Sequence, residues 1–358
     1  MTGSFLRYYM RKEIVLHCET VTPLFLGNAR QDAEWRSAPF KALLRYWWRV
    51  TQHDQTNAKT LLREESNLFG SAGEKEGEDA GKSFVNVRVF SEAKPIVDRF
   101  KRNLKNISHP ETKQTEVKPL LYLAGMGLMS TDETPKHSYF PAKSSFEFFI
   151  DYPSKIENDL QPTFAAIQAF GSLGARSRKG WGSFQIDPEL VSKEAAIRSL
   201  GDCTKEWKTG FEKDYPNCLG RDRGKLLLWK TEIQKDGWEK VMRELADVYV
   251  SVRAKEVAGI SKLDPDGEDY PSERHLLGFP LTHHPARKKW RNTARHGSPL
   301  RFVVKEKPNG FQGLILHLPH RFSDEMEPMT KEKQMEVWDK VHQKFDKVLT
   351  RAQYEDCL

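Results

Sequence analysis

The segment 171–184 (GSLGARSRKGWGSF), called the glycine loop below, combines four glycines with three cations and contains no acidic residue. Glycine permits positive φ and lets a ligand backbone approach closely. Successive exposed N–H groups beside cations form a concavity that suits phosphate groups. We therefore predict phosphate binding here, with an ordinary turn carrying solvated charges as the alternative. The candidate residues are Gly171, Gly174, Arg176, Ser177, Arg178, Lys179 and Gly180.

The expected neighbours of the glycine loop argue against a nucleotide cofactor. A helix beginning at Pro162 is expected before the loop, and a strand at 182–187 after it. Dinucleotide and P-loop sites have a strand before the glycine-rich turn and a helix after it. The order here favours a polymer backbone lying across the loop. KGWGSFQI also echoes the RNA-contacting strand of RRM domains, although Ser183 stands at an aromatic position.

A second group of cations accompanies the first expected helix, residues 39–50 (PFKALLRYWWRV). Cations recur every four residues in this helix and form a stripe on the face away from its apolar residues. We interpret the stripe as a candidate RNA contact. A solvated face, with Trp48 packed on a neighbour, is the alternative. The candidates are Arg36, just before the helix, and Lys41, Arg45 and Arg49.

Two further stretches are basic. Residues 283–301 hold six cations, among them Arg301, with Trp290 interleaved and no acid. Cations beside an aromatic suit single-stranded nucleic acid, because they combine phosphate neutralisation with a stacking surface. Residues 99–118 form the other basic stretch, and solvated loops are the alternative for both. The candidates from 283–301 are Arg287, Lys288, Arg291 and Arg295.

Evidence for catalysis or a metal is weak. Asp32 lies in the loop after the first expected strand, where an acid beside bound RNA could assist cleavage. No recognisable base or ligand set accompanies it, so a surface residue is the simpler interpretation. The pairs His283–His284 and His317/His320 lack metal-site spacing. We expect no cofactor, no metal and four reduced cysteines.

Composition limits the class of protein. The 358 residues carry a net charge of +7 with a pI near 9.0, which is compatible with a polyanionic partner. A hydrophobic content of 38% is enough for packed cores. No run of about 18 apolar residues and no signal peptide are recognisable. We therefore expect a cytoplasmic protein without a membrane partner.

The elements that must position these residues follow a recognisable order. In the first half it is strand, helix, strands, helix, strand, the order of the split βαβ or ferredoxin-like fold that some single-stranded RNA readers use. A connector is expected at 190–224. We predict an α+β protein of two ferredoxin-like (βαββαβ, RRM-like) domains with insertions, at 1–190 and 191–358, the second a degraded copy. The expected strands are 12–21, 83–90, 118–124, 144–151, 182–187, 225–230, 299–305 and 311–318, and the later helices are 237–253 and 330–351.

Three segments resemble the signature segments of the RAMP superfamily of CRISPR proteins, in particular the first subunit of type III-B effector complexes. They are TPLFLGN (22–28), RSAPFKALLRYWWR (36–49) and the glycine loop, and SPLRFVV (298–304) adds a weaker likeness. Carried over by position, Lys41 and Arg45 match the basic residues of the family's first helix, and Gly174, Arg176, Arg178 and Gly180 match its loop. Ala42, Pro39 and Ser172 depart from the family's pattern.

The resemblance implies a non-catalytic RNA-binding subunit at the head end of a ribonucleoprotein filament in antiviral defence. Its partners would be guide RNA, target RNA and the other subunits of a type III-B complex. The alternatives are a RAMP endoribonuclease that uses Asp32, and an architectural subunit whose basic surfaces dock acidic partner proteins.

Overall fold

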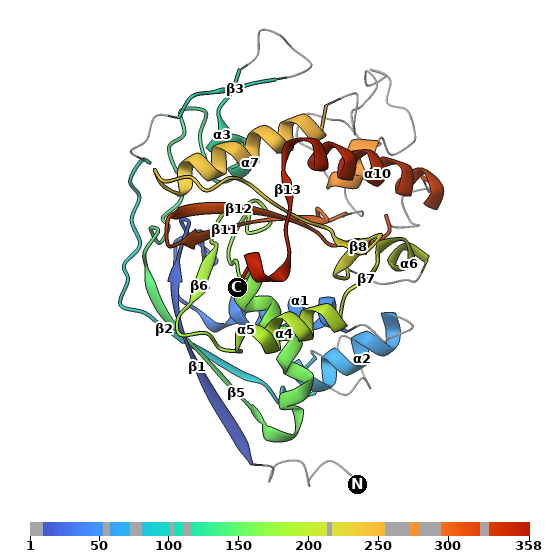
Figure 1. Ribbon diagram of the computed structural model, residues 1–358. Coiled ribbons are helices and arrows are strands. Elements are labelled where there is room, and N and C mark those ends of the chain that lie inside the picture. Colours follow the sequence, from blue (N-terminus) through green and yellow to red (C-terminus); the bar gives the residue numbers. More distant parts are fainter. Residues whose placement is uncertain are drawn as a thin grey trace.

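The computed structural model describes residues 10–52, 58–71, 81–100, 104–109, 116–212, 217–254, 273–278, 295–322 and 329–358. Helices and antiparallel sheets alternate in layers (Figure 1). The expected α+β class is confirmed. No described helix is long and apolar enough to cross a membrane.

The first sheet is built by the N-terminal half of the chain. Its strands lie in the order β2 (Asn86–Phe90), β5 (Ser145–Pro153), β1 (Arg11–Thr20) and β6 (Phe184–Ile186), and all pairs are antiparallel. Side chains alternate along β1, so Leu16 and Cys18 are buried whereas Val15 and His17 are exposed. The buried face packs on α1 (Ser37–Thr51) and α4 (Glu157–Phe170), and the other face is open.

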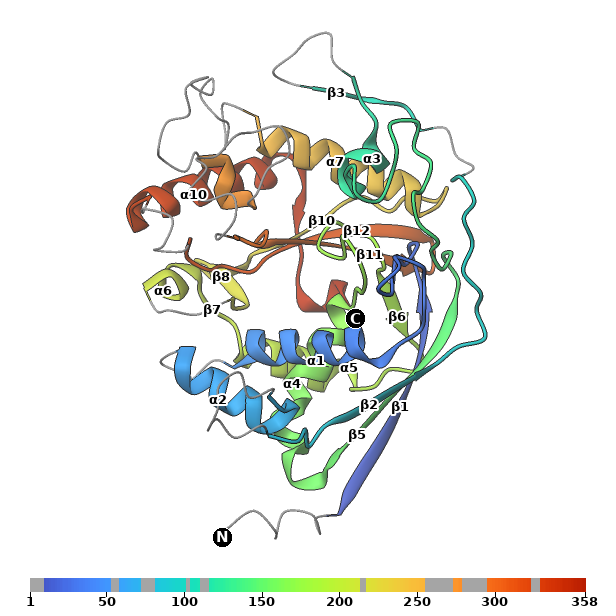
Figure 2. The ribbon, with the colours of Figure 1, turned by 180° about the vertical axis from the view of Figure 1, so that it is seen from behind.

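The second sheet lies on the far side of α1 and α4 (Figure 2). Its order is β11 (Leu300–Lys307), β12 (Gly310–His317), β10 (Leu228–Lys230) and β13 (Thr350–Arg351). Phe302 and Val304 of β11 share a core with α7 (Trp238–Val252) and α10 (Lys331–Val348). Val303, between them, joins the core of α1 and α4. The second sheet is therefore covered on both faces.

Shorter elements complete the described fold. A three-stranded sheet of order β7-β8-β9 and a two-stranded sheet of β3 and β4 lie outside the two main sheets. The remaining elements are α2 (Ala58–Phe69), β3 (Ile107–Ser108), β4 (Glu116–Val117), α3 (Pro119–Ala124), η2 (Ser154–Ile156), α5 (Lys193–Asp202), β7 (Lys205–Glu206), α6 (Trp207–Glu212), β8 (Gly220–Asp222), β9 (Lys225–Leu226), η3 (Glu273–Leu277) and η5 (Tyr354–Asp356).

Three expectations about these elements are wrong, and one helix was not expected. Residues 118–124 form the helix α3 and not a strand, because Pro119 occupies the first helical turn, where its missing N–H costs nothing. Pro162 lies inside α4 and does not begin it. The expected connector holds α5, which Ser192 caps by accepting from the N–H of Ala195. No element was expected at 58–69, and these residues fold into α2 because an apolar stripe, Leu61 and Phe69 included, packs on the core.

Candidate nucleic-acid interface

The three signature segments meet around one hollow of about 430 Å³. The loop after β1, one face of α1 and the glycine loop line it, and β11 contributes one residue. The lining holds three arginines and, among the described residues, no carboxylate. Its polar members are Gln31, Arg36, Tyr46, Ser172, Ser177, Arg178 and Arg301.

Glycine is required where the glycine loop crosses the loop after β1. Gly174 has a φ of +79°, and a Cβ there would lie 2.4 Å from the carbonyl oxygen of Phe25. Gly182 has a φ of +64°, and its Cβ would lie 2.0 Å from the carbonyl oxygen of Leu173. A side chain at either position would combine a disfavoured conformation with a backbone clash. These glycines therefore hold two chain segments in contact.

The backbone of the glycine loop does not offer a row of free donors, contrary to expectation. At roughly every second position the N–H donates within the protein, for example from Ala175 to the carbonyl of Phe25 at 2.8 Å. An anion in this hollow would therefore be bound by side chains. The occupied N–H groups are those of Leu173, Ala175, Ser177, Lys179, Gly182, Ser183 and Phe184.

Two guanidinium groups from distant parts of the chain lie near the Tyr46 ring. The Cζ atoms of Arg178 and Arg301 lie 5.6 and 4.8 Å from its centroid. Arg178 is half-buried and donates to the carbonyl of Ser298 at 3.4 Å. Arg301 is only 5% exposed and donates to the Ser172 hydroxyl at 2.6 Å. Among the described residues, no carboxylate pairs with either arginine.

Other predicted residues of the loop have different surroundings. Arg176 is exposed with a φ of 59°, and its guanidinium packs over Gly125. Lys179 is buried, and its ammonium lies 3.8 Å from the Tyr249 ring centroid. Burial lowers the pKa of Lys179. Burial raises the pKa of Tyr249, but the charges of Lys179 and Arg253 outweigh that effect and set it at about 8.

Two cations of the stripe on α1 pair with a carboxylate that the sequence did not suggest as a partner. Arg45 and Arg49 both pair with the buried Glu65 of α2, at 2.6 and 2.7 Å. Burial and the charge of Arg45 lower the pKa of Lys41. Arg36 precedes α1, donates to the carbonyl of Gly27 and lines the hollow. Of the four cations predicted at this helix, only Arg36 lines the hollow.

The other predicted residues either lie outside the described part of the chain or are exposed. Arg287, Lys288, Arg291 and the pair His283–His284 lie outside the described residues. Arg295 is exposed. Asp32 is exposed in the turn after β1, and within the described part of the chain no hydrogen bond or ion pair holds its carboxylate.

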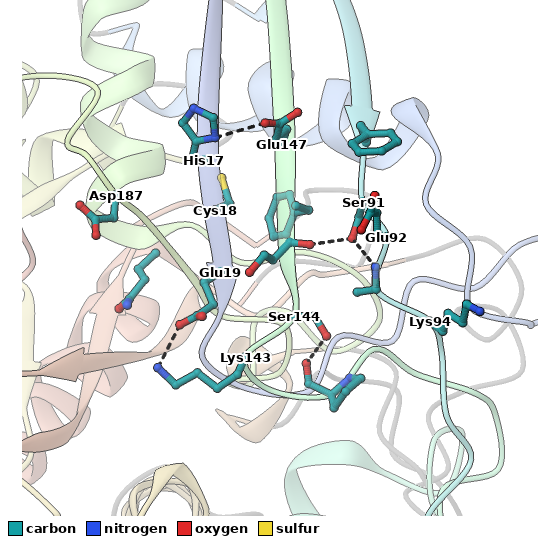
Figure 3. Close-up of a pocket in the computed structure, with 16 residues that line it drawn as sticks. His17, Cys18, Glu19, Ser91, Glu92, Lys94, Lys143, Ser144, Glu147 and Asp187 are labelled. Atoms are coloured by element: carbon teal, nitrogen blue, oxygen red, sulfur yellow. Dashed lines mark hydrogen bonds and ion pairs between the residues drawn. The ribbon is translucent and has the colours of Figure 1, made fainter.

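A larger hollow of about 670 Å³ lies at the open face of the first sheet (Figure 3). It differs from the first in having carboxylates in its lining, among them Glu19, Glu147 and Asp187. His17 lies 3.4 Å from Glu147, and Lys143 pairs with Glu19 at 2.9 Å. Carboxylates repel phosphate groups, so this face suits RNA less well than the arginine-lined hollow.

The likeness of KGWGSFQI to an RRM strand does not extend to function. Trp181 and Phe184 are buried at 0% and 1% exposure, so neither ring can stack on a base. The described histidines also form no metal-site geometry. His317 is buried against His342, and the described residues include no group of three or more potential metal ligands. All four cysteines are buried, and none of them forms a disulfide.

Sequence reasoning missed Tyr46 and gave Arg301 no individual role. Arg301 was one cation in a long basic stretch, and only the alternation of β11 could single it out. In β11, Arg301, Val303 and Lys305 point toward α1 and α4, where Lys305 donates to the carbonyl of Gln168 at 2.8 Å. Tyr46 is adjacent in the sequence to the core residue Trp47. The sequence therefore gave no sign that Tyr46 lies beside the glycine loop.

Residues 17–185 match the family model of the RAMP superfamily. This half of the chain is related to that superfamily. The matched segment contains α1, the glycine loop and every residue that lines the arginine-lined hollow of about 430 Å³, except Arg301. The resemblance expected from the three signature segments is therefore confirmed.

One curated relative supports the RAMP assignment. Over 197 residues, or 54% of the chain, it is 28% identical to "CRISPR system Cmr subunit Cmr1-1" of Pyrococcus furiosus. The alignment spans about half the length of that relative, 52%.

One of the similar solved structures shares the fold. The crystal structure of Cmr1 from Pyrococcus furiosus in its apo form has a TM-score of 0.52 and 20% identity, with 96% of this chain and 98% of that one covered. A chain of the type III-B Cmr-beta bound to cognate target RNA has a TM-score of 0.46 and 11% identity, covering 91% and 99%.

Proposed function

We propose that this chain is a non-catalytic RNA-binding subunit of a type III-B CRISPR RNA-guided effector complex. The hollow lined by three arginines and no described carboxylate carries the proposal. Phosphate contacts dominate the affinity of most proteins for nucleic acids, and arginine matches phosphate geometry. The relative named as a Cmr subunit supports the choice of complex.

The ligand would be guide or target RNA, and the protein partners would be other subunits of the complex, acting in the cytoplasm in antiviral defence. Arg36, Arg178 and Arg301 would contact phosphates from the hollow, and Arg176 would extend the surface. We leave Arg45, Arg49 and Lys179 out of the contact set, because Glu65 holds the first two and burial shields the third.

We also propose that the chain comprises two ferredoxin-like domains, divided near residue 190. The two main sheets support this because both have the order second, third, first, fourth strand. In each, one helix follows the first strand (α1, α7) and another precedes the last (α4, α10). The cores of the two units are not separate, since Val303 of β11 packs with α1 and α4.

A non-catalytic role is consistent with the surroundings of Asp32. A catalytic acid or base needs a partner that positions it and adjusts its proton affinity. The Asp32 backbone is fixed by hydrogen bonds with Asn28 at 2.8 and 3.1 Å, whereas its exposed carboxylate has no described partner. Cleavage of RNA by the purified chain that Asp32→Ala abolished would contradict this part of the proposal.

The test of RNA binding is a salt titration with fluorescently labelled single-stranded RNA. We expect Arg36→Gln/Arg178→Gln to weaken binding at least about a hundredfold, because two charge-assisted hydrogen bonds are lost and each contributes about 1.5–3 kcal/mol. The log–log salt slope should fall by about 0.7 for each lost phosphate contact. The matched control is Arg88→Gln, which removes an exposed arginine from the open sheet face.

Unchanged affinity and slope in the double variant would contradict the assignment of the hollow. RNA crosslinking with peptide mapping on the assembled complex provides an independent measurement. We expect crosslinks in the glycine loop and the start of α1. Crosslinks absent from this chain would favour an architectural subunit.

A further inference from the structure

We propose that Arg178 and Arg301, whose guanidinium groups both lie beside the Tyr46 ring, form a clamp for a single backbone phosphate of the RNA strand. This inference rests on the proposed RNA-binding function and deepens it. The clamp joins the two halves of the chain, since Arg178 belongs to the glycine loop and Arg301 to β11.

The orientation of Arg301 follows from its strand. It shares a face of β11 with Val303 and Lys305, and this face packs toward α1 and α4. Lys305 reaches a backbone carbonyl there, whereas Arg301 reaches the Ser172 hydroxyl and the rings of Tyr46 and Trp47. The Nε atom of Arg301 is buried and has no hydrogen-bond partner. The Nε–H group of Arg301 is thus a hydrogen-bond donor without an acceptor in a residue that lines the hollow.

The charges around Tyr46 point to an anion. Burial lowers the pKa of Arg301, the contact with Tyr46 raises it, and the charge of Arg178 lowers it. Two cations about one ring repel each other, and burial of an unpaired guanidinium is unfavourable. The two aromatic rings offset only part of this cost. Since no described carboxylate lies in the lining, a bound anion would supply the missing counter-charge.

A phosphodiester fits this arrangement better than a protein carboxylate. Two arginines can each donate to separate oxygens of a phosphate, and the hydroxyls of Ser172 and Ser177 line the same hollow. Arg36, just before α1, also lines the hollow, and it would contact the neighbouring phosphate of the same strand. An acidic segment of a partner protein is the competing occupant, and the experiment distinguishes the two.

The experiment follows the side-chain Nε–H signals of the full chain by NMR. The Arg301 and Arg178 signals are assigned as those missing in Arg301→Lys and Arg178→Gln. The probes are a ten-residue oligouridine, the dinucleotide UpU, the neutral methylphosphonate analogue of UpU and a tetraglutamate peptide. We expect the two RNA probes to shift both signals and the neutral analogue to shift neither.

Binding of the decamer gives the second readout. We expect Arg301→Lys and Arg178→Gln each to weaken it about tenfold, because a lysine cannot reproduce two-point contact and a glutamine removes the charge. The control Arg88→Gln should stay within about twofold, since an exposed surface charge contributes little. If Arg301→Lys fails to fold, the half-buried Arg178 still tests the clamp.

The outcomes separate the clamp from the proposed function. Decamer binding with both signals unmoved, or equal shifts with the neutral analogue, would overturn the clamp and leave RNA binding intact. Shifts with tetraglutamate alone would also overturn it, in favour of an acidic partner. A wild-type chain that binds no RNA, alone or assembled, would overturn both proposals.

Discussion

His317 and His342 form a buried pair whose response to acid can be calculated. They lie on β12 and α10, with His317 Nδ1 2.8 Å from His342 Nε2 and neither ring more than 2% exposed. His317 also stacks on Trp338 at 3.9 Å between centroids. Burial lowers the pKa of His317 well below its usual value and that of His342 to about 3. Both rings are therefore neutral in the folded chain at pH 5.

In the unfolded chain both histidines bind a proton near pH 6.5. Because the unfolded chain then holds more protons than the folded chain, the free energy of unfolding decreases as pH falls below about 6.5. Each histidine contributes a slope of about 1.4 kcal/mol per pH unit, or about 2 kcal/mol between pH 7 and pH 5. The pair therefore costs the folded state about 4 kcal/mol over this interval.

The measurement is urea unfolding between pH 7 and pH 5, followed by tryptophan fluorescence. Trp338 stacks on the pair, so the signal reports this core. We expect His342→Gln to reduce the slope of the unfolding free energy between pH 6 and pH 5 by about 1.4 kcal/mol per pH unit. His17→Gln is the control, because His17 is exposed on the open sheet face. An unchanged slope in His342→Gln would refute the reasoning.

Three further predictions concern the site and its supports. Glu65→Gln should lower the unfolding free energy by about 2 kcal/mol, measured by urea unfolding, because two arginines of α1 lose their shared carboxylate. Gly174→Ala should destabilise the chain by about 2 kcal/mol more than Gly224→Ala in the same assay, since both have positive φ but only Gly174 meets a backbone oxygen. Tyr249 should ionise with a midpoint near pH 8 in an ultraviolet titration, and Lys179→Met should raise that midpoint.

Many elements could be predicted from the sequence because they depend on local patterns. The alternation in β1 and the apolar stripe of α1 give strand and helix wherever those segments lie. The elements that were missed or misassigned depend on tertiary packing. The helix α2 is a polar segment with a narrow apolar stripe, and it is held by burial of Leu61, Phe69 and an ion pair to α1.

The candidate site likewise combines features that the sequence determined with features that depend on tertiary packing. Residue types and order in the glycine loop determined the chemistry, a cationic turn suited to phosphate, and the family that it resembles. Only the tertiary structure decided which cations face the hollow. Glu65 holds Arg45, the Tyr249 ring shelters Lys179, and the alternation of β11 turns Arg301 toward Tyr46. The physical reason is that the availability of a charge depends on its burial and its partners, and these come from segments far apart in the sequence.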